Sequence, residues 1–490
     1  MTLLLIIISL VFFSLTSKFY PKRKRFFVII SVLSIIFFYF FLANILLKPT
    51  NFFPSKTNNI YVPCGNYYNL LVDSFRNYKL NIFEYIDIPK NEDIHYTYNT
   101  SLLDVSFYKN KFYLYFGITP ILLFYLPFNL ITKLYLTDKF LVFLLSCLSF
   151  LFSLFLVKKV TENYTNVDLS LKILSLFLIG LCNLLPFMIT NSFIYQIAVL
   201  SANILLLIAL CCFYYYITNE NIKFKNCLIF VISFFLCLCV GARPHYILFI
   251  PIFFYFIIHS QHKTNFKEKF KSILFFLIPC LIYGTILALY NYLRFESIFE
   301  FGWRYQLNPH NQFDFSPTIK DFLIGLKNNF FILPDINEKT FFSLTRNTDH
   351  SLGAEYIVGV FWTCPIIVIL FFIPQFMKQV YKENPKNFIF LLTLITIIII
   401  NTIVTCFFGM IIRYIFEFLS LTIILAVIVF LFYINKAKDK LLKKFLITSF
   451  ILIFIFSLFI NISLLFCREN FWIYRTLQNT NYTKTVNFLF

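Results

Sequence analysis

Positively charged side chains are concentrated in six short segments that separate long apolar runs. These segments hold 21 Lys and Arg residues and only 6 Asp and Glu residues, which accounts for 15 of the formal net charge of +19. They cover residues 21–25, 158–172, 218–226, 259–271, 375–387 and 435–444. The two long polar segments, 48–116 and 293–355, are nearly balanced in charge. Because Lys and Arg accumulate in the cytoplasmic loops of membrane proteins, this pattern predicts that both long segments lie on the extracytoplasmic face.

The composition requires a membrane environment. The chain has 490 residues, of which 59% are hydrophobic, and its mean hydropathy is +0.78. Several apolar runs reach the roughly 20 residues that a helix needs to cross a bilayer; examples are 26–47, 194–217, 388–408 and 445–466. We therefore predict an all-α membrane protein. The basic charge is divided among short loops, which argues against a nucleic-acid partner and favours attraction to anionic lipid headgroups.

We predict about twelve transmembrane helices, arranged as a polytopic helical bundle that forms one membrane domain over residues 1–490. The expected spans are 2–19, 26–47, 140–157, 171–190, 194–217, 227–241, 245–258, 272–292, 356–377, 388–408, 411–434 and 445–466. The apolar run that opens the chain precedes the basic residues 22–25, which is the reverse of the order in a secretory signal peptide. This order predicts an extracytoplasmic N-terminus and a first span that runs inward.

The apolar stretch 117–135 decides the topology. If it crossed the membrane, the last three basic segments, which hold 12 Lys, would lie outside, and segment 293–355 would lie inside. We therefore predict that 117–135 does not cross, with an ordinary span as the alternative. Pro120 and Pro127 are typical of a broken helix, here one that lies in the outer leaflet. This predicts a first extracytoplasmic loop over 48–139 and a second over 293–355.

Two aspartates in the first long segment are candidates for a catalytic base. Residues 103–120 are predicted to form a strand, a Lys-Asn-Lys turn and a second strand that leads into the broken helix. Asp104 begins this hairpin, where its carboxylate could deprotonate an acceptor hydroxyl or amine. A turn or capping role is the structural alternative. Asp73, in a short amphipathic helix over 67–75, is a second candidate.

Ionisable residues inside or beside apolar runs are candidates for ligand binding. Arg243 and His245 lie in or next to the turn 241–244, which interrupts two short apolar runs. A guanidinium at this depth could bind a lipid phosphate in two places, or extend to the headgroups as an anchor. Arg413 and Glu417 are four residues apart and share a helix face. They could form a buried ion pair or line an anion-binding cavity.

The second long segment opens with residues that could also contact a ligand. Arg304 and Tyr305, next to Trp303, lie at a predicted membrane edge. An arginine and aromatic rings there could bind a phosphate or stack on a sugar, but aromatic belts at membrane interfaces have the same composition. The twelve Cys residues show no CxxC pair and no metal-ligand spacing with His, so the sequence predicts no specific metal site.

Segments 67–80, 108–115 and 117–135, in this order, resemble the first outer loop of GT-C type glycosyltransferases, in the bacterial branch similar to protein mannosyltransferases and lipid A aminoarabinose transferase. In that branch a short helix, a small turn with an aromatic pair and a Pro-containing helix in the outer leaflet follow the early span. Residues 241–244 resemble a turn that ends a middle span of those enzymes on the outer side. The similarity covers about 64–420 and is closer to a less characterised group of bacterial membrane proteins.

The resemblance implies a GT-C-like fold and the transfer of a sugar from a polyprenyl-phosphate-linked donor to a glycan, lipid or protein acceptor. The reaction would take place at the extracytoplasmic face of the bacterial cytoplasmic (inner) membrane, with membrane lipids around the donor. The better known enzymes carry an acidic residue just before the first outer helix, whereas residues 62–66 contain no carboxylate here. Either Asp104 or Asp73 therefore takes the role of the base, or the chain is not a transferase of that kind.

Under this hypothesis Arg243, Arg304 and Arg413 bind the phosphate leaving group, and no nucleotide cofactor is needed. Enzymes of this class can use a divalent metal, for which the sequence shows no clear ligand set. Two other functions stay open. The chain could be a transporter or flippase that moves a lipid-linked glycan without bond cleavage, although no pair of matching halves is visible. It could also be a glycan polymerase or ligase that shares the lipid-phosphate chemistry.

Overall fold

The computed structural model describes residues 24–45, 67–84, 105–162, 164, 167–218, 222–260, 265–307, 317–337, 341–347, 355–408 and 411–465. Within these ranges, nine helical segments are long and apolar enough to cross a membrane. They are α2 (Lys24–Ile45), α6 (Asp138–Val160), α7 (Leu169–Leu181) joined with α8 (Leu185–Thr190), α9 (Ile194–Thr218), α10 (Ile222–Ala242), α12 (Phe266–Phe295), α16 (Pro385–Phe408), α17 (Ile412–Lys436) and α18 (Lys440–Leu464). The predicted polytopic helical membrane fold is confirmed.

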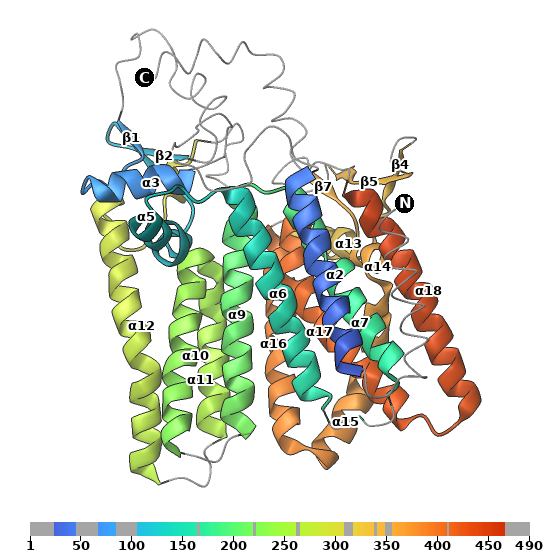
Figure 1. Ribbon diagram of the computed structural model, residues 1–490. Helices are drawn as coiled ribbons and strands as arrows, with labels where there is room; N and C mark the ends of the chain where they lie inside the picture. The colour runs from blue at the N-terminus through green and yellow to red at the C-terminus, as the bar shows by residue number, and fades with distance from the viewer. Residues whose placement is uncertain are drawn as a thin grey trace.

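Two other predicted spans are present as interrupted helices. The 3₁₀ turn η4 (Pro244–Leu248) continues into α11 (Phe249–His259). Since a 3₁₀ helix rises about 2.0 Å per residue and an α-helix about 1.5 Å, this short segment extends roughly 27 Å. The second is built from α14 (Val360–Thr363), η7 (Pro365–Phe372) and α15 (Ile373–Glu383), which lead from the upper end of the bundle to the lower end (Figure 1). The predicted first span, 2–19, lies outside the described residues.

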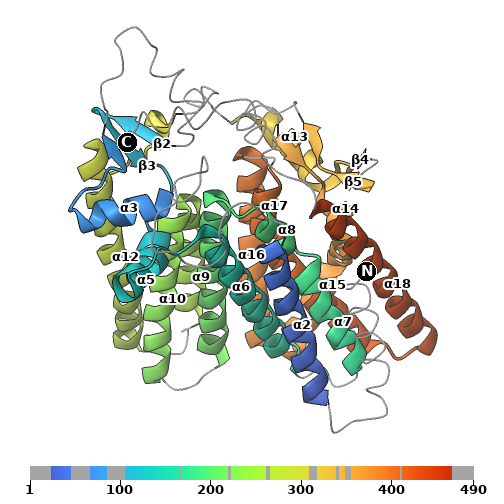
Figure 2. The same ribbon diagram turned by 45° about the horizontal axis from the view of Figure 1, so that its top comes forward.

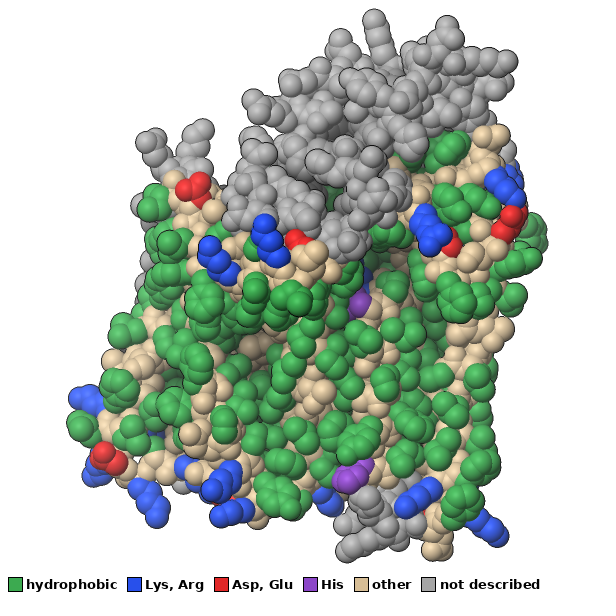
Figure 3. Space-filling view, turned by 180° about the vertical axis from the view of Figure 1, so that it is seen from behind, with side chains coloured by type: hydrophobic (Ala, Val, Ile, Leu, Met, Phe, Trp, Pro, Cys, Tyr) green, Lys and Arg blue, Asp and Glu red, His purple; other side chains and the backbone are tan. Residues whose placement is uncertain are grey.

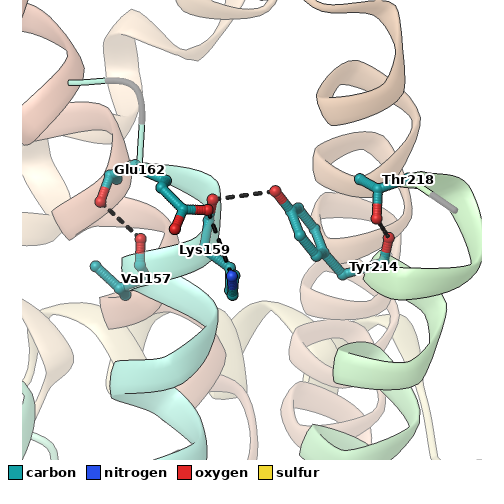
Figure 4. Close-up of polar contacts among 6 residues, drawn as sticks. Val157, Lys159, Glu162, Tyr214 and Thr218 are labelled. Atoms are coloured by element: carbon teal, nitrogen blue, oxygen red, sulfur yellow. Dashed lines mark hydrogen bonds and ion pairs between the residues drawn. The ribbon is translucent and has the colours of Figure 1, made fainter.

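The helix ends that flank the six basic segments all lie at one end of the bundle (Figure 1). Lys and Arg side chains predominate along this lower rim, whereas blue and red side chains lie next to one another along the upper rim (Figure 3). At the lower end, Tyr214 of α9 donates to the backbone carbonyl of Lys159 of α6 at 3.0 Å, and Lys159 lies 3.4 Å from Glu162 (Figure 4). The charge separation between the two ends agrees with the predicted orientation, and the assignment of the ends to membrane faces stays a prediction.

The upper end carries small sheets and short helices (Figure 2). Strands β1 (Phe83–Glu84), β3 (Lys111–Leu114) and β2 (Val105–Tyr108) form one antiparallel sheet in that order. The predicted hairpin is confirmed: Tyr108 pairs with Lys111, and the two turn residues Lys109 and Asn110 both have positive φ, as tight hairpins require. The remaining elements here are α3 (Tyr67–Arg76), α13 (Ile319–Phe331), η5 (Trp303–Tyr305) and the strand pairs β4 (Asp335–Asn337) with β5 (Phe341–Ser343) and β6 (Thr345–Asn347) with β7 (Glu355–Ile357).

The two long polar segments meet at this upper end. The Ser106 hydroxyl donates to the carbonyl of Gly302 at 2.9 Å, and the Leu307 amide donates to the carbonyl of Val105 at 2.8 Å. Lys109 at the hairpin tip forms an ion pair with Glu296, and this hydrogen bond lowers the pKa of the Glu296 carboxyl. Residues about 190 positions apart therefore form one surface.

The stretch 117–135 does not run the length of the bundle. It contains the π-helical turn η3 (Ile121–Tyr125) and α5 (Leu126–Thr132), which together have twelve residues and extend about 18 Å. This is well short of the roughly 30 Å hydrocarbon core. Lys133 in the left-handed conformation ends α5, and the chain enters α6 at the same upper end (Figure 1). The placement of this segment in the outer leaflet stays a prediction.

Helix α17 occupies the centre of the bundle and α12 one edge. The apolar window of α17 is completely buried by other parts of the protein, whereas only 28% of the α12 window is buried. Helix α12 packs mainly on α10 and leaves a long apolar face exposed, as a lipid-facing helix does. A polar group on α17 therefore lies in the interior, and one near the top of α12 lies close to lipid.

Gly117 and Gly241 bring two backbone segments into direct contact. A Cβ atom on Gly117 would lie 2.0 Å from the carbonyl oxygen of Gly241, and one on Gly241 would lie 2.0 Å from the hydroxyl oxygen of Tyr283. Thr119 holds the same approach together by donating to the carbonyl of Leu238 at 2.8 Å. The connection after β3 is therefore fixed against the upper ends of α10 and α12.

Gly117→Ala is expected to destabilise the protein by about 1–3 kcal/mol, because the added methyl group overlaps backbone atoms that cannot rotate away. The measurement is the midpoint of thermal unfolding of the purified protein in detergent. Gly284→Ala is the matched control, since a Cβ on Gly284 meets no atom within 4 Å and alanine favours a helix. Equal midpoints for the two variants would contradict the close approach.

Candidate anion-binding site beside the α10–η4 turn

A cavity of about 70 Å³ lies where the chain that follows β3 meets two other stretches. Residues 115–118 after β3 form one wall, and residues 240–244 at the end of α10 form the second. The third wall is the last part of α12, which contributes Leu287, Tyr290, Asn291 and Arg294. The cavity thus combines a polar upper end with apolar walls next to the lipid-facing helix.

Arg294 is the most deeply buried cation of this cavity, with 3% of its surface exposed. Its two terminal nitrogens donate to the carbonyl of Leu114 and to the side-chain oxygen of Asn291, both at 2.8 Å. Its guanidinium lies 3.9 Å from the centre of the Tyr290 ring. Among the described residues no carboxylate forms an ion pair with it, and its Nε atom has no hydrogen-bond partner. A buried cation without an anion is costly, so this position favours binding of an anion.

Arg243 also lines the cavity, at the end of α10, and the local sequence explains its position. Helix α10 ends at Ala242 because a residue that precedes proline, here Pro244, is driven out of the helical conformation. Arg243 is accordingly extended, with φ −143° and ψ 106°. One terminal nitrogen lies 2.7 Å from Glu417, and the guanidinium lies over the ring of Tyr414. Its buried Nε atom has no hydrogen-bond partner among the described residues.

Glu417 anchors the α10–η4 turn to the centre of the bundle. The residue is 2% exposed, and its second carboxylate oxygen lies 2.9 Å from Nε2 of His245. The side chain of Asn401 donates to its backbone carbonyl at 3.2 Å. One carboxylate thus faces Arg243 and His245 together, which leaves the charge of Arg294 unbalanced within the cavity.

Arg413 does not pair with Glu417. Its guanidinium lies 4.3 Å from the ring centre of Tyr195 and 5.2 Å from that of Tyr414. The spacing of four residues allows a pair on one helix face, but Arg243 and His245 approach the carboxylate from the adjoining turn instead. Of the residues that the sequence singles out for binding, the structure brings Arg243, His245 and Glu417 together.

The remaining predicted residues lie apart from this cluster. Asp73 accepts a hydrogen bond from the hydroxyl of Tyr135 at 2.7 Å and does not line the cavity. The side chain of Arg304 is 81% exposed and lies 3.8 Å from Glu300. Tyr305 packs against Tyr108, with ring centres 4.6 Å apart.

Asp104 lies outside the described residues, but the backbone next to it is placed. Val105 pairs with Leu114 in the hairpin, and Leu114 is the residue whose carbonyl accepts from Arg294. The hairpin is thus linked to the cavity through Arg294, which lines it. Sequence reasoning did not select Arg294. The sequence feature that could have identified Arg294 is its position directly after an apolar run. Within the described residues, no group of three or more His, Cys, Asp and Glu side chains is placed to hold a metal ion.

Comparison with known proteins gives distant structural likenesses. No family model and no curated protein matches the chain. The oligosaccharyltransferase of Archaeoglobus fulgidus in its apo form matches with a TM-score of 0.47, and archaeal AglB from the same organism, in complex with an inhibitory peptide and a dolichol-phosphate, matches with 0.44. Both are 12% identical, and each match covers 88% of this chain. The chain spans 55% of the length of these structures. Likeness at this distance does not indicate an activity.

Proposed function

We propose that the protein is a membrane glycosyltransferase that moves a sugar from a polyprenyl-phosphate-linked donor to an acceptor on the extracytoplasmic face of the bacterial cytoplasmic membrane. The observation that carries the proposal is the cavity that both Arg243 and Arg294 line. A guanidinium presents a planar fork of donors that matches phosphate oxygens. Two of them at one cavity, with a single carboxylate held by Arg243 and His245, favour a phosphate group as the ligand.

The position of the cavity favours a lipid as the carrier of that phosphate. Its apolar wall includes Leu287 of α12, and α12 exposes a long apolar face along the rest of its length. A prenyl chain can lie along such a face while its phosphate enters the cavity from the side. A water-soluble phosphate ester has no apolar chain that could pack on this face of α12.

The chemistry assigns a role to each part of the site. The bond between the anomeric carbon and the phosphate oxygen breaks, and a bond forms between that carbon and an acceptor oxygen or nitrogen. Asp104 takes the acceptor proton as general base, and polyprenyl phosphate leaves. Arg243 and Arg294 stabilise the negative charge that develops on the leaving phosphate. The resemblance of segments 67–135 to the first outer loop of GT-C type enzymes supports the same assignment.

Arg294→Gln is expected to slow release of polyprenyl phosphate by about 10- to 100-fold, which is the effect of losing one charge-assisted hydrogen bond. The purified protein in lipid nanodiscs is incubated with polyprenyl-linked sugars extracted from its source cells, and the released polyprenyl phosphate is measured by mass spectrometry. Arg76→Gln is the matched control, because Arg76 is exposed on α3 and, within the described part of the chain, its side chain bonds only to Asn129, at 3.4 Å. An unchanged rate in Arg294→Gln would remove the cavity from the reaction.

The same preparation separates the transferase from a transporter. In reconstituted vesicles, movement of the lipid-linked sugar across the bilayer without cleavage of the sugar–phosphate bond would identify a flippase. Release of polyprenyl phosphate without net movement would identify a transferase. The glycan polymerase or ligase is distinguished by its products, since only these activities lengthen a glycan or join a completed one to a second lipid.

A further inference from the structure

An aromatic pair lies beside the cavity, and one of its two members lines it. Tyr115 lines the cavity, and its ring centre lies 6.1 Å from that of Trp303, with the two planes inclined at 51°. The pair joins the end of the β2–β3 hairpin to η5 in the second long polar segment. Gly302, with φ 97°, makes the turn that presents Trp303, a conformation that favours glycine. Two segments that are distant in sequence are thus shaped to bring these rings together.

Trp303 has exposed surface and an indole N–H that are not taken up by contacts among the described residues. It is 37% exposed, although its neighbour Tyr305 packs between Tyr108 and Phe295. Its indole N–H forms no hydrogen bond with any described residue. By comparison, Trp362 on α14 donates its N–H to the carbonyl of Phe331 at 3.1 Å. An aromatic face and an indole N–H that has no partner among the described residues are therefore available together next to Tyr115.

We propose that Tyr115 and Trp303 bind the pyranose ring of the lipid-linked sugar. The proposal rests on the proposed function, because it takes the phosphate to lie in the cavity. In a glycosyl phosphate the sugar ring is joined to phosphorus through one oxygen atom, so the ring must lie directly beside the phosphate. Tyr115 belongs to both the cavity wall and the aromatic pair, which places the pair within reach of that ring.

The physical basis is the amphipathic character of a pyranose. One face of the ring presents polarised C–H groups, which pack on the negative face of an aromatic ring, while the hydroxyl groups at its edge remain free to hydrogen-bond. The indole N–H of Trp303 and the exposed guanidinium of Arg304, the next residue along the chain, could donate to these hydroxyl groups. An ordinary interfacial anchor would use the same residue types but would have no effect on sugar binding.

Trp303→Leu tests this inference with two ligands. The Michaelis constant is measured for polyprenyl-linked sugars extracted from the source cells, and the inhibition constant is measured for undecaprenyl phosphate, which has no sugar. We expect the Michaelis constant to rise about tenfold, as for the loss of one aromatic contact, and the inhibition constant to stay the same. Trp303→Phe, which preserves the packing on Tyr115, is expected to show a smaller rise. Trp362→Leu is the matched control at the same end of the bundle.

The outcomes distinguish this inference from the function on which it rests. A rise in the Michaelis constant alone, absent in Trp362→Leu, supports a sugar site at Trp303. If both constants rise together, or if neither changes, the aromatic pair does not recognise the sugar. The proposal that the cavity binds the phosphate is not contradicted by either result. If wild-type protein releases no polyprenyl phosphate and does not bind it, the proposed function fails, and the sugar site fails with it.

Discussion

Asp104→Asn is expected to lower the rate of polyprenyl phosphate release by about 10²–10⁴-fold while leaving the affinity for undecaprenyl phosphate unchanged. An amide has nearly the shape of a carboxylate but cannot take up the proton of the acceptor hydroxyl or amine. Loss of a general base has an effect of this size. The residue that follows Asp104 pairs with Leu114, which Arg294 binds through its carbonyl. The measurement is single-turnover release from protein in nanodiscs, with binding of undecaprenyl phosphate measured separately.

Two further variants make this result specific. Asp73→Asn examines the other candidate base, whose carboxylate is already bonded to Tyr135. We expect it to change the rate much less than Asp104→Asn does, and the reverse order would transfer the role of base to Asp73. Glu162→Gln removes a carboxylate from the opposite end of the bundle, where it faces Lys159, and is expected to leave the rate unchanged.

Glu417→Leu is expected to lower the free energy of unfolding by about 3–5 kcal/mol, the typical effect of removing one partner of a buried ion pair. The carboxylate is 2% exposed and lies within 3 Å of both Arg243 and His245. Without it, the Arg243 guanidinium remains in the bundle with no anion to balance its charge. The check is the midpoint of unfolding of the purified protein in detergent, compared with wild type.

A second substitution distinguishes loss of charge balance from loss of packing. In Arg243→Met with Glu417→Leu, neither buried charge is left alone, and replacement of a buried pair by apolar residues is often close to neutral. We therefore expect the double variant to recover most of the lost stability, while its binding of polyprenyl phosphate is weakened because Arg243 is absent. A double variant less stable than Glu417→Leu would show that Arg243 stabilises the turn through its stacking on Tyr414 instead.

The membrane class and the arrangement of charge follow from local features of the chain. Long apolar runs can be satisfied only as helices in lipid, so the positions of α9, α16, α17 and α18 could be read from hydropathy. The β2–β3 hairpin could also be predicted from the sequence, because strand-forming residues flank the Lys-Asn-Lys turn. In the structure, the turn residues Lys109 and Asn110 have positive φ, as such a turn requires. The prediction that 117–135 does not cross rests on the charge balance among distant loops, a sum that requires no knowledge of contacts.

The partners of the buried charges could not be read in this way. Spacing suggested Arg413 for Glu417, but the carboxylate meets Arg243 and His245 because their turn packs against the middle of the bundle. Arg294 looked like one more residue at a membrane edge, and its contact with the Leu114 carbonyl joins positions 180 residues apart. Apolar runs and charge are local properties of the chain, so they can be read from the sequence. Which helix ends come together depends on packing among all the helices, and no short segment of sequence determines it.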